Sequence, residues 1–163
     1  MRNPLLHNTF KCGGLASGKK LKVGEGKDKI LLNKGKNMET KLKKILVIED
    51  DPDELVSLTQ ILKRAGYITI GVPTGEEGLE KFKEEKPDLV ILDVMLPGID
   101  GWEVLRRIKS GIRSRKVPVI MLTGKSEDED KIRGYEFGAD FYVTKPYNIH
   151  KLLPIIRGII TGK

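Results

Sequence analysis

Short apolar runs rich in β-branched residues alternate, from residue 43 onward, with segments whose apolar residues recur at helical spacing. The length and composition of these runs predict five β-strands. They cover residues 44–48, 67–72, 89–92, 117–122 and 141–143. Several of the runs are apolar throughout rather than alternating, which is typical of strands that are covered on both faces.

The segments between the strands predict amphipathic helices. Their apolar faces consist of Leu55, Leu58, Ile61, Leu62 and Ala65, then Leu79 and Phe82, then Val104, Leu105 and Ile108, and finally Ile132, Tyr135 and Phe137. Capping signals stand at several of the expected helix starts. Asp51, Thr74 and Ser126 are each followed three residues later by a glutamate, and Asn148 is suited to cap the last helix.

Five β/α pairs in this order predict an α/β fold, with a doubly wound, five-stranded parallel sheet and helices on both faces, because crossovers between parallel strands are right-handed.

The last helix is unusual, since Pro154 lies well inside it. Proline removes a backbone hydrogen bond, so we expect a kink or a late start there. Its apolar residues are too many for one face, which leaves two alternatives: an exposed partner surface or a helix packed closely on the sheet.

Charge is distributed unevenly along the 163 residues, which carry a net charge of +7. Residues 1–41 hold ten Lys and Arg against three Asp and Glu, whereas the remainder is balanced. We expect residues 1–42 to form a basic, disordered leader and residues 43–163 to form the folded domain, because the leader has too little apolar surface to offset its ordering entropy. The leader could be an expression leader or a miscalled start with Met38 as the first residue, an inert linker, or an arm that contacts nucleic acid or anionic lipid. A nucleic-acid role is the weakest of these interpretations, since Phe10 is its only aromatic residue.

Membrane insertion and secretion are not expected. The chain has no apolar run of the roughly 18 residues needed to cross a bilayer, and no secretory signal at its start. A single cysteine, Cys12, excludes an internal disulfide. These features predict a cytoplasmic location.

Polar residues gather where the predicted strands end, which is where parallel α/β sheets bind ligands. Glu49 and Asp50 follow the first strand, Asp93 the third, Thr123 the fourth and Lys145 the fifth. Converging carboxylates repel one another unless a cation joins them, and an oxygen-only ligand set suits Mg²⁺ or Mn²⁺. Aspartate is also a nucleophile towards phosphoryl groups, whose charge Lys145 and the Thr123 hydroxyl could stabilise.

Each of these residues also has an ordinary structural interpretation. The acids after the first strand could cap the next helix, Asp93 and the Thr123-Gly124 pair could be turn residues, and Lys145 could be a solvated surface group. The order of all five residues at the ends of the expected strands favours chemistry.

The segments ILVIEDDPDEL, VILDVMLPGIDGWEVLRRIK, VPVIMLTG and GADFYVTKPY occur in one register over residues 43–162. In these segments the chain resembles a response-regulator receiver domain, of the single-domain chemotaxis-regulator type with a flavodoxin-like fold. The resemblance implies that Asp93 accepts a phosphoryl group from a sensor histidine kinase or a phosphotransfer protein. It implies no other enzymatic activity than the protein's own phosphorylation and dephosphorylation.

The resemblance also implies roles for the neighbouring residues. Glu49, Asp50, Asp93 and the Met95 backbone carbonyl would hold the metal ion. Thr123 and Lys145 would contact the phosphoryl oxygens, and Tyr142 would be the aromatic switch, although Tyr142 alone is equally suited to be a static core residue. Output would come from an unknown downstream protein bound at the face formed by the fourth helix, the fifth strand and the fifth helix.

Some features depart from the family pattern or leave other functions open. Phe141 replaces an aspartate that is frequent in the family, which puts a charge-paired dimer in doubt and favours a monomer or a weak, phosphorylation-dependent dimer. A phosphohydrolase would need an acid at Met95, and a flavin-binding protein would need a Gly-rich phosphate loop after the first strand. The chain could also be a fragment of a longer kinase or regulator.

Overall fold

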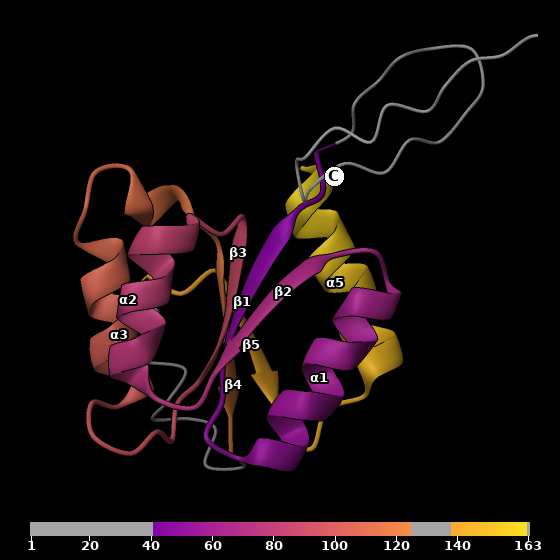
Figure 1. Ribbon diagram of the computed structural model, residues 1–163, viewed down its shortest axis with the longest axis horizontal. Coiled ribbons are helices and arrows are strands. Elements are labelled where there is room, and N and C mark those ends of the chain that lie inside the picture. The colour runs from indigo at the N-terminus through magenta and orange to yellow at the C-terminus, as the bar shows by residue number, and fades with distance from the viewer. Residues whose placement is uncertain (1–40, 125–137, 163) are drawn as a thin grey trace, which may run out of the picture.

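The computed structural model of the chain describes residues 41–124 and 138–162 (Figure 1). Strands and helices alternate along these residues. In order they are β1 (Lys44–Ile48), α1 (Pro52–Arg64), β2 (Ile68–Val72), α2 (Gly75–Glu85), β3 (Leu89–Asp93), α3 (Gly101–Lys109), the 3-10 turn η1 (Ser114–Lys116), β4 (Val119–Thr123), β5 (Phe141–Thr144) and α5 (Ile149–Thr161).

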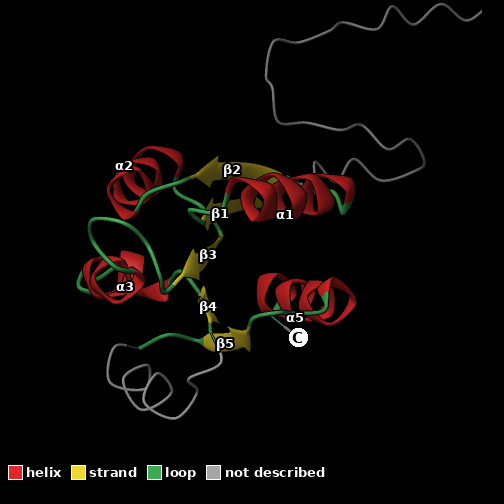
Figure 2. Cartoon of the chain, turned by 90° about the horizontal axis from the view of Figure 1, so that it is seen from below, coloured by secondary structure: helices red, strands yellow, loops and turns green. Residues whose placement is uncertain are grey.

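The five strands form one parallel sheet in the order β2-β1-β3-β4-β5. Figure 2 shows α2 and α3 against one face of the sheet and α1 and α5 against the other. This arrangement confirms the predicted doubly wound fold. The register pairs Ile48 with Leu92 and Asp93 with Leu122, so the carboxyl ends of the central strands are nearly level.

Two apolar clusters separate on the two faces because side chains alternate along a strand. The cluster on the side of α2 and α3 contains the strand residues Leu46, Ile48, Val90 and Leu92 and the α3 residue Trp102. It is called the α2/α3 cluster. The other face is formed by the strand residues Ile45, Val47, Ile91 and Ile120, which pack against Leu58 and Leu62 of α1 and Leu152 and Ile156 of α5. The central strands β3 and β4 are buried along their whole length, as their apolar sequences predict.

The predicted helix caps are present at the starts of the described helices. The side chains of Asp51, Thr74 and Asn148 accept hydrogen bonds from backbone N–H groups in the first turns of α1, α2 and α5. Asp100 caps α3 in the same way. Each of these helices follows a strand in the chain, so its amino end comes after the carboxyl end of that strand.

Helix α5 corrects one prediction. It begins at Ile149, directly after its Asn148 cap, and continues through Pro154 to Thr161. Of the two expected alternatives, the late start is therefore wrong, and the kink stays a prediction. The exposed Pro154 ring lies away from the sheet, while Leu152 and Ile156 are fully buried and hold the helix in place. Its other large apolar residues are partly buried against the same cluster, which favours the packed alternative over an exposed apolar surface.

The expected fourth helix, with Ile132, Tyr135 and Phe137, and the expected cap Ser126 lie outside the described residues, as does nearly all of the expected leader. Within the described part of the chain, no helix has the length and apolar character needed to span a membrane.

Candidate functional site

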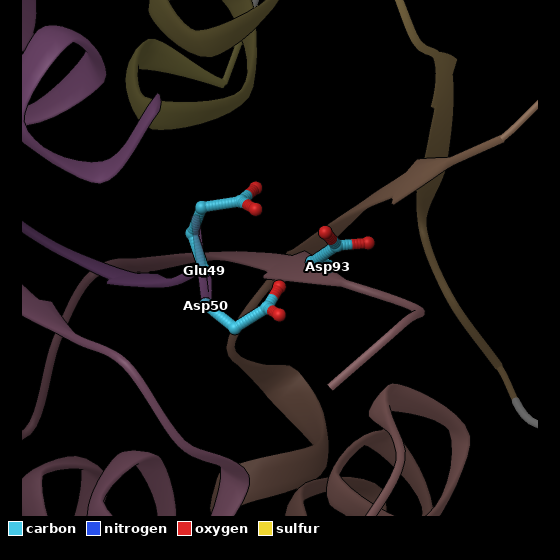
Figure 3. A group of neighbouring side chains, drawn as sticks. All are labelled: Glu49, Asp50 and Asp93. Atoms are coloured by element: carbon cyan, nitrogen blue, oxygen red, sulfur yellow. The ribbon is translucent and has the colours of Figure 1, made fainter. Parts of the chain in front are cut away.

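Three carboxylates meet at the carboxyl edge of the sheet. Glu49 and Asp50 directly follow β1, and Asp93 ends β3, which pairs with β1. One oxygen from each lies within 4.8 Å of the others, and Figure 3 shows the three side chains turned towards a shared space. Glu49 and Asp93 are buried, with 1% and 4% of their surface exposed, and Asp50 is exposed. This all-oxygen cluster, open to solvent on the side of Asp50, could hold a hard metal ion.

Lys145 supplies positive charge to the space between the carboxylates of Glu49, Asp50 and Asp93, which we call the cleft. Its Nζ lies 2.6 Å from Asp93 Oδ2 and 2.7 Å from Glu49 Oε2. The residue follows β5, and its backbone N–H donates a 2.7 Å hydrogen bond to the Thr123 carbonyl at the end of β4. Burial alone would lower the pKa of the Lys145 amine, but hydrogen bonds to the carboxylates of Asp93, Glu49 and Glu54 raise it above its usual range. The ammonium therefore stays charged at any physiological pH.

Burial and charge oppose each other at Glu49. Removal from water raises the pKa of its carboxyl, the hydrogen bond from Lys145 lowers it, and the nearby Asp93 raises it. Together these effects raise the pKa of Glu49 to about 7. Without a bound cation, a substantial fraction of Glu49 is therefore protonated at neutral pH. A divalent cation would have to displace that proton, because only the ionised carboxylate is a good ligand.

The Asp93 carboxylate is oriented on both sides. Its Oδ1 accepts a 3.0 Å hydrogen bond from the Met95 backbone N–H, and its Oδ2 faces Lys145. Behind it, Gly101 packs directly on the Asp93 carbonyl, where a Cβ atom would collide with the backbone. The strand end is thus fixed, and the carboxylate faces the cleft.

The remaining predicted residues come from β4, β5 and the segment after β3. Thr123 is buried at the end of β4 and is paired in register with Thr144 of β5. Met95 is 74% exposed and contacts Asp93 through its N–H. Tyr142 of β5 is half-buried against the α2/α3 cluster, with its ring centroid 6.4 Å from that of Trp102.

Glu54 is a residue of the cleft that the sequence patterns did not indicate. Its spacing from Asp51 predicted a capping box, and its backbone N–H does donate to Asp51 Oδ1 at 2.9 Å. Its carboxylate, however, lies across the cleft, with Oε2 2.8 Å from Lys145 Nζ. Beside it, burial and the charge of Glu54 together raise the pKa of the Tyr147 hydroxyl to about 12.

The described residues thus form a parallel doubly wound sheet that carries an acid cluster, a buried aspartate and a lysine at its carboxyl edge. A sequence profile of the response regulator receiver domain matches residues 45–157. The chain belongs to this family, which acts in two-component signalling.

Individual relatives and solved structures agree with this assignment. The chain is 42% identical over 118 residues to the alkaline phosphatase synthesis transcriptional regulatory protein PhoP of Bacillus subtilis, and 33% identical over 119 residues to protein PilH of Pseudomonas aeruginosa. A crystal structure of a putative response regulator from Chloroflexus aurantiacus superposes with a TM-score of 0.70 at 33% identity, covering 74% of this chain and 99% of that one. A CheY-like receiver domain protein from Methanospirillum hungatei gives a TM-score of 0.70 at 34% identity, covering 75% and 96% of the two chains.

The relatives differ in how much of their own length is matched. The alignment covers 72% of this chain but only 48% of PhoP, so this chain spans about half of that regulator. With PilH the alignment covers 73% of this chain and 98% of the relative. The matched region is therefore about half of PhoP but nearly all of PilH.

Proposed function

We propose that the protein is a phosphoacceptor of a two-component or phosphorelay system in which Asp93 receives the phosphoryl group. The observation that carries the proposal is the position of the Asp93 carboxylate, which lies between two further acids and one ammonium in a single cleft. The donor would be a phosphohistidine on a sensor histidine kinase or a phosphotransfer protein, as is usual in this family.

In this reaction an Asp93 carboxylate oxygen attacks phosphorus and forms a P–O bond. The P–N bond to the donor imidazole breaks, and its electron pair stays on the imidazole nitrogen. The proposed ligands for Mg²⁺ or Mn²⁺ are Glu49, Asp50, Asp93 and the Met95 carbonyl. When bound, the ion would neutralise negative charge on the oxygens of the transferred phosphoryl group. Lys145 provides a second positive charge and Thr123 a hydroxyl donor for the same oxygens.

The phosphoryl group adds nearly two negative charges and three acceptor oxygens to a buried strand end. We propose that Thr123 and Lys145 move towards it and that Tyr142 turns inward as the aromatic switch. The output would be the binding of a downstream protein at the face that includes β5 and α5. The receiver itself would act in the cytoplasm, as a monomer or a weak, phosphorylation-dependent dimer. Residues 43–163 would carry this function, and residues 1–42 would be a basic leader. The only reactions that the protein would catalyse are its own phosphorylation and dephosphorylation.

Intact-protein mass spectrometry after incubation with acetyl phosphate and Mg²⁺ tests the proposal. Acetyl phosphate would transfer its phosphoryl group to Asp93 and leave as acetate, so the wild-type protein should gain the mass of one phosphoryl group. Asp93→Asn should gain none, because an amide is a poor nucleophile. Equal labelling of both proteins would show that another residue is the acceptor.

A further inference from the structure

Three carboxylates surround the Lys145 ammonium, and they do not have equivalent positions. Asp93 and Glu49 lie 2.6 and 2.7 Å from Nζ and belong to the acid cluster. Glu54 lies 2.8 Å from Nζ, but it comes from the first turn of α1 and is outside that cluster. The ammonium donates hydrogen bonds to Asp93 and Glu49, whereas Glu54 forms an ion pair with it.

Glu54 also differs from the other two in the exposure of its side chain to solvent. Its side chain is 42% exposed, whereas Glu49 and Asp93 have side-chain exposures of 1% and 6%. An open hollow of about 380 Å³ lies next to it, lined by Asp53, Glu54, Ser57, Pro146 and Tyr147. The Oε2 atom that faces Lys145 is itself shielded from solvent, so the charge pair is partly desolvated. Such a pair is stronger than one fully in water.

We propose that Glu54 is a positioning residue that competes with the phosphoryl group for Lys145 and favours cation binding over phosphorylation. This inference rests on the proposed function, since it assigns Lys145 to the phosphoryl oxygens. Glu54 disfavours the phosphorylated state in two ways: it attracts the ammonium that the phosphoryl group needs, and its negative charge repels the incoming dianion.

The same carboxylate has the opposite effect on cation binding. Its negative charge attracts a divalent cation, and its hold on Lys145 reduces the competition of the ammonium for the oxygens of Glu49 and Asp93. Removing the charge of Glu54 should therefore weaken cation binding and strengthen phosphorylation. A loss of structure at the start of α1 would weaken both, so the opposite signs distinguish positioning from a general structural role.

The test compares the full-length wild-type protein with Glu54→Gln and Asp53→Asn. Asp53→Asn is a matched control, because it removes one carboxylate from the neighbouring position of α1, beside the same hollow. Mg²⁺ affinity is measured by isothermal titration calorimetry at pH 8, above the pKa of about 7 of Glu49. The phosphorylation rate with acetyl phosphate at saturating Mg²⁺ is measured by intact mass, and circular dichroism confirms that each variant is folded.

Glu54→Gln should bind Mg²⁺ about three- to tenfold more weakly and be phosphorylated about three- to tenfold faster. Asp53→Asn should stay within about twofold of wild type in both quantities. These ranges are expected for one charge a few ångströms away in a partly solvated site. If Glu54→Gln shifts both quantities in the same direction, or behaves like Asp53→Asn, the inference is overturned and the proposed function stands. If the wild-type protein takes up no phosphoryl group, both are overturned.

Discussion

At the scale of single residues, Glu49 gives the cleft a specific dependence on pH. Its pKa of about 7 in the folded protein lies above the ordinary value of 4.5, because the carboxyl is buried. The folded state therefore binds this proton more tightly than the unfolded state does. The contribution of this group to stability is complete below about pH 4.5 and is lost as the pH rises through about 7.

Mg²⁺ should therefore stabilise the protein more at pH 8 than at pH 6, because at pH 6 it must first displace the proton on Glu49. Thermal unfolding with and without 10 mM Mg²⁺, on the order of a saturating concentration, measures the difference. In Glu49→Gln the metal-free stability should also vary less between pH 5 and pH 8. A shift in melting temperature by Mg²⁺ that is equal at both pH values would contradict this assignment.

Most of the cleft at this scale could be predicted from the sequence. Glu49, Asp50, Asp93 and Lys145 come together because strand ends of a parallel sheet share one edge, and that rule needs only the order of the elements. The position of the Glu54 carboxylate could not be predicted in the same way. A glutamate in the first turn of a helix can reach back to its own cap or across to another element, and local spacing does not distinguish the two.

At the scale of secondary-structure elements, the junction between β3 and α3 fixes the position of Asp93. Gly101 begins α3, and its backbone N–H donates a 3.0 Å hydrogen bond to the Val94 carbonyl. A Cβ atom at this position would collide with the Asp93 carbonyl and would lie 2.8 Å from Val94 Cα. Both neighbours are backbone atoms, so the whole helix start would have to shift.

Gly101→Ala should therefore lower the free energy of unfolding by about 1–3 kcal/mol or more, the usual range for overpacking. Urea denaturation measures the change. Gly124→Ala is a control at another strand end, since its Cβ would meet no atom of the described residues within 4 Å. Equal stabilities for the two variants would show that the junction can relax.

The sequence predicted the helix starts better than the course of α5. Side-chain caps are local, and Asp51, Thr74 and Asn148 all function as their spacing predicts. The proline rule allowed a late start of α5, which the helix does not have, because the rule considers only one backbone hydrogen bond. Burial of Leu152 on the sheet, on the N-terminal side of Pro154, is a tertiary contribution that the local rule leaves out.

At the scale of the whole molecule, Trp102 connects the cleft with the proposed switch. It is the only tryptophan of the protein, it follows Gly101 at the start of α3, and its ring lies 6.4 Å from that of Tyr142. Because the indole is buried, with 7% of the residue exposed, its emission should respond to any rearrangement of this contact.

Phosphorylation, or binding of the phosphoryl analogue beryllofluoride, should therefore change the fluorescence of Trp102 if Tyr142 turns inward. In Tyr142→Ala the change should be clearly smaller, while intact mass should show that phosphorylation itself persists. An identical fluorescence change in Tyr142→Ala would assign the signal to the cleft alone and count against the switch role of Tyr142.

A crystal structure of the protein with Mg²⁺ and beryllofluoride tests the central claim most directly, because it shows which atoms hold the phosphoryl analogue. The account predicts a beryllium–oxygen bond to an Asp93 carboxylate oxygen, the cation among Glu49, Asp50 and Asp93, and Lys145 Nζ in contact with a fluoride. The analogue bound at another residue, or Lys145 directed away from it while the cation occupies the acid cluster, would contradict the account.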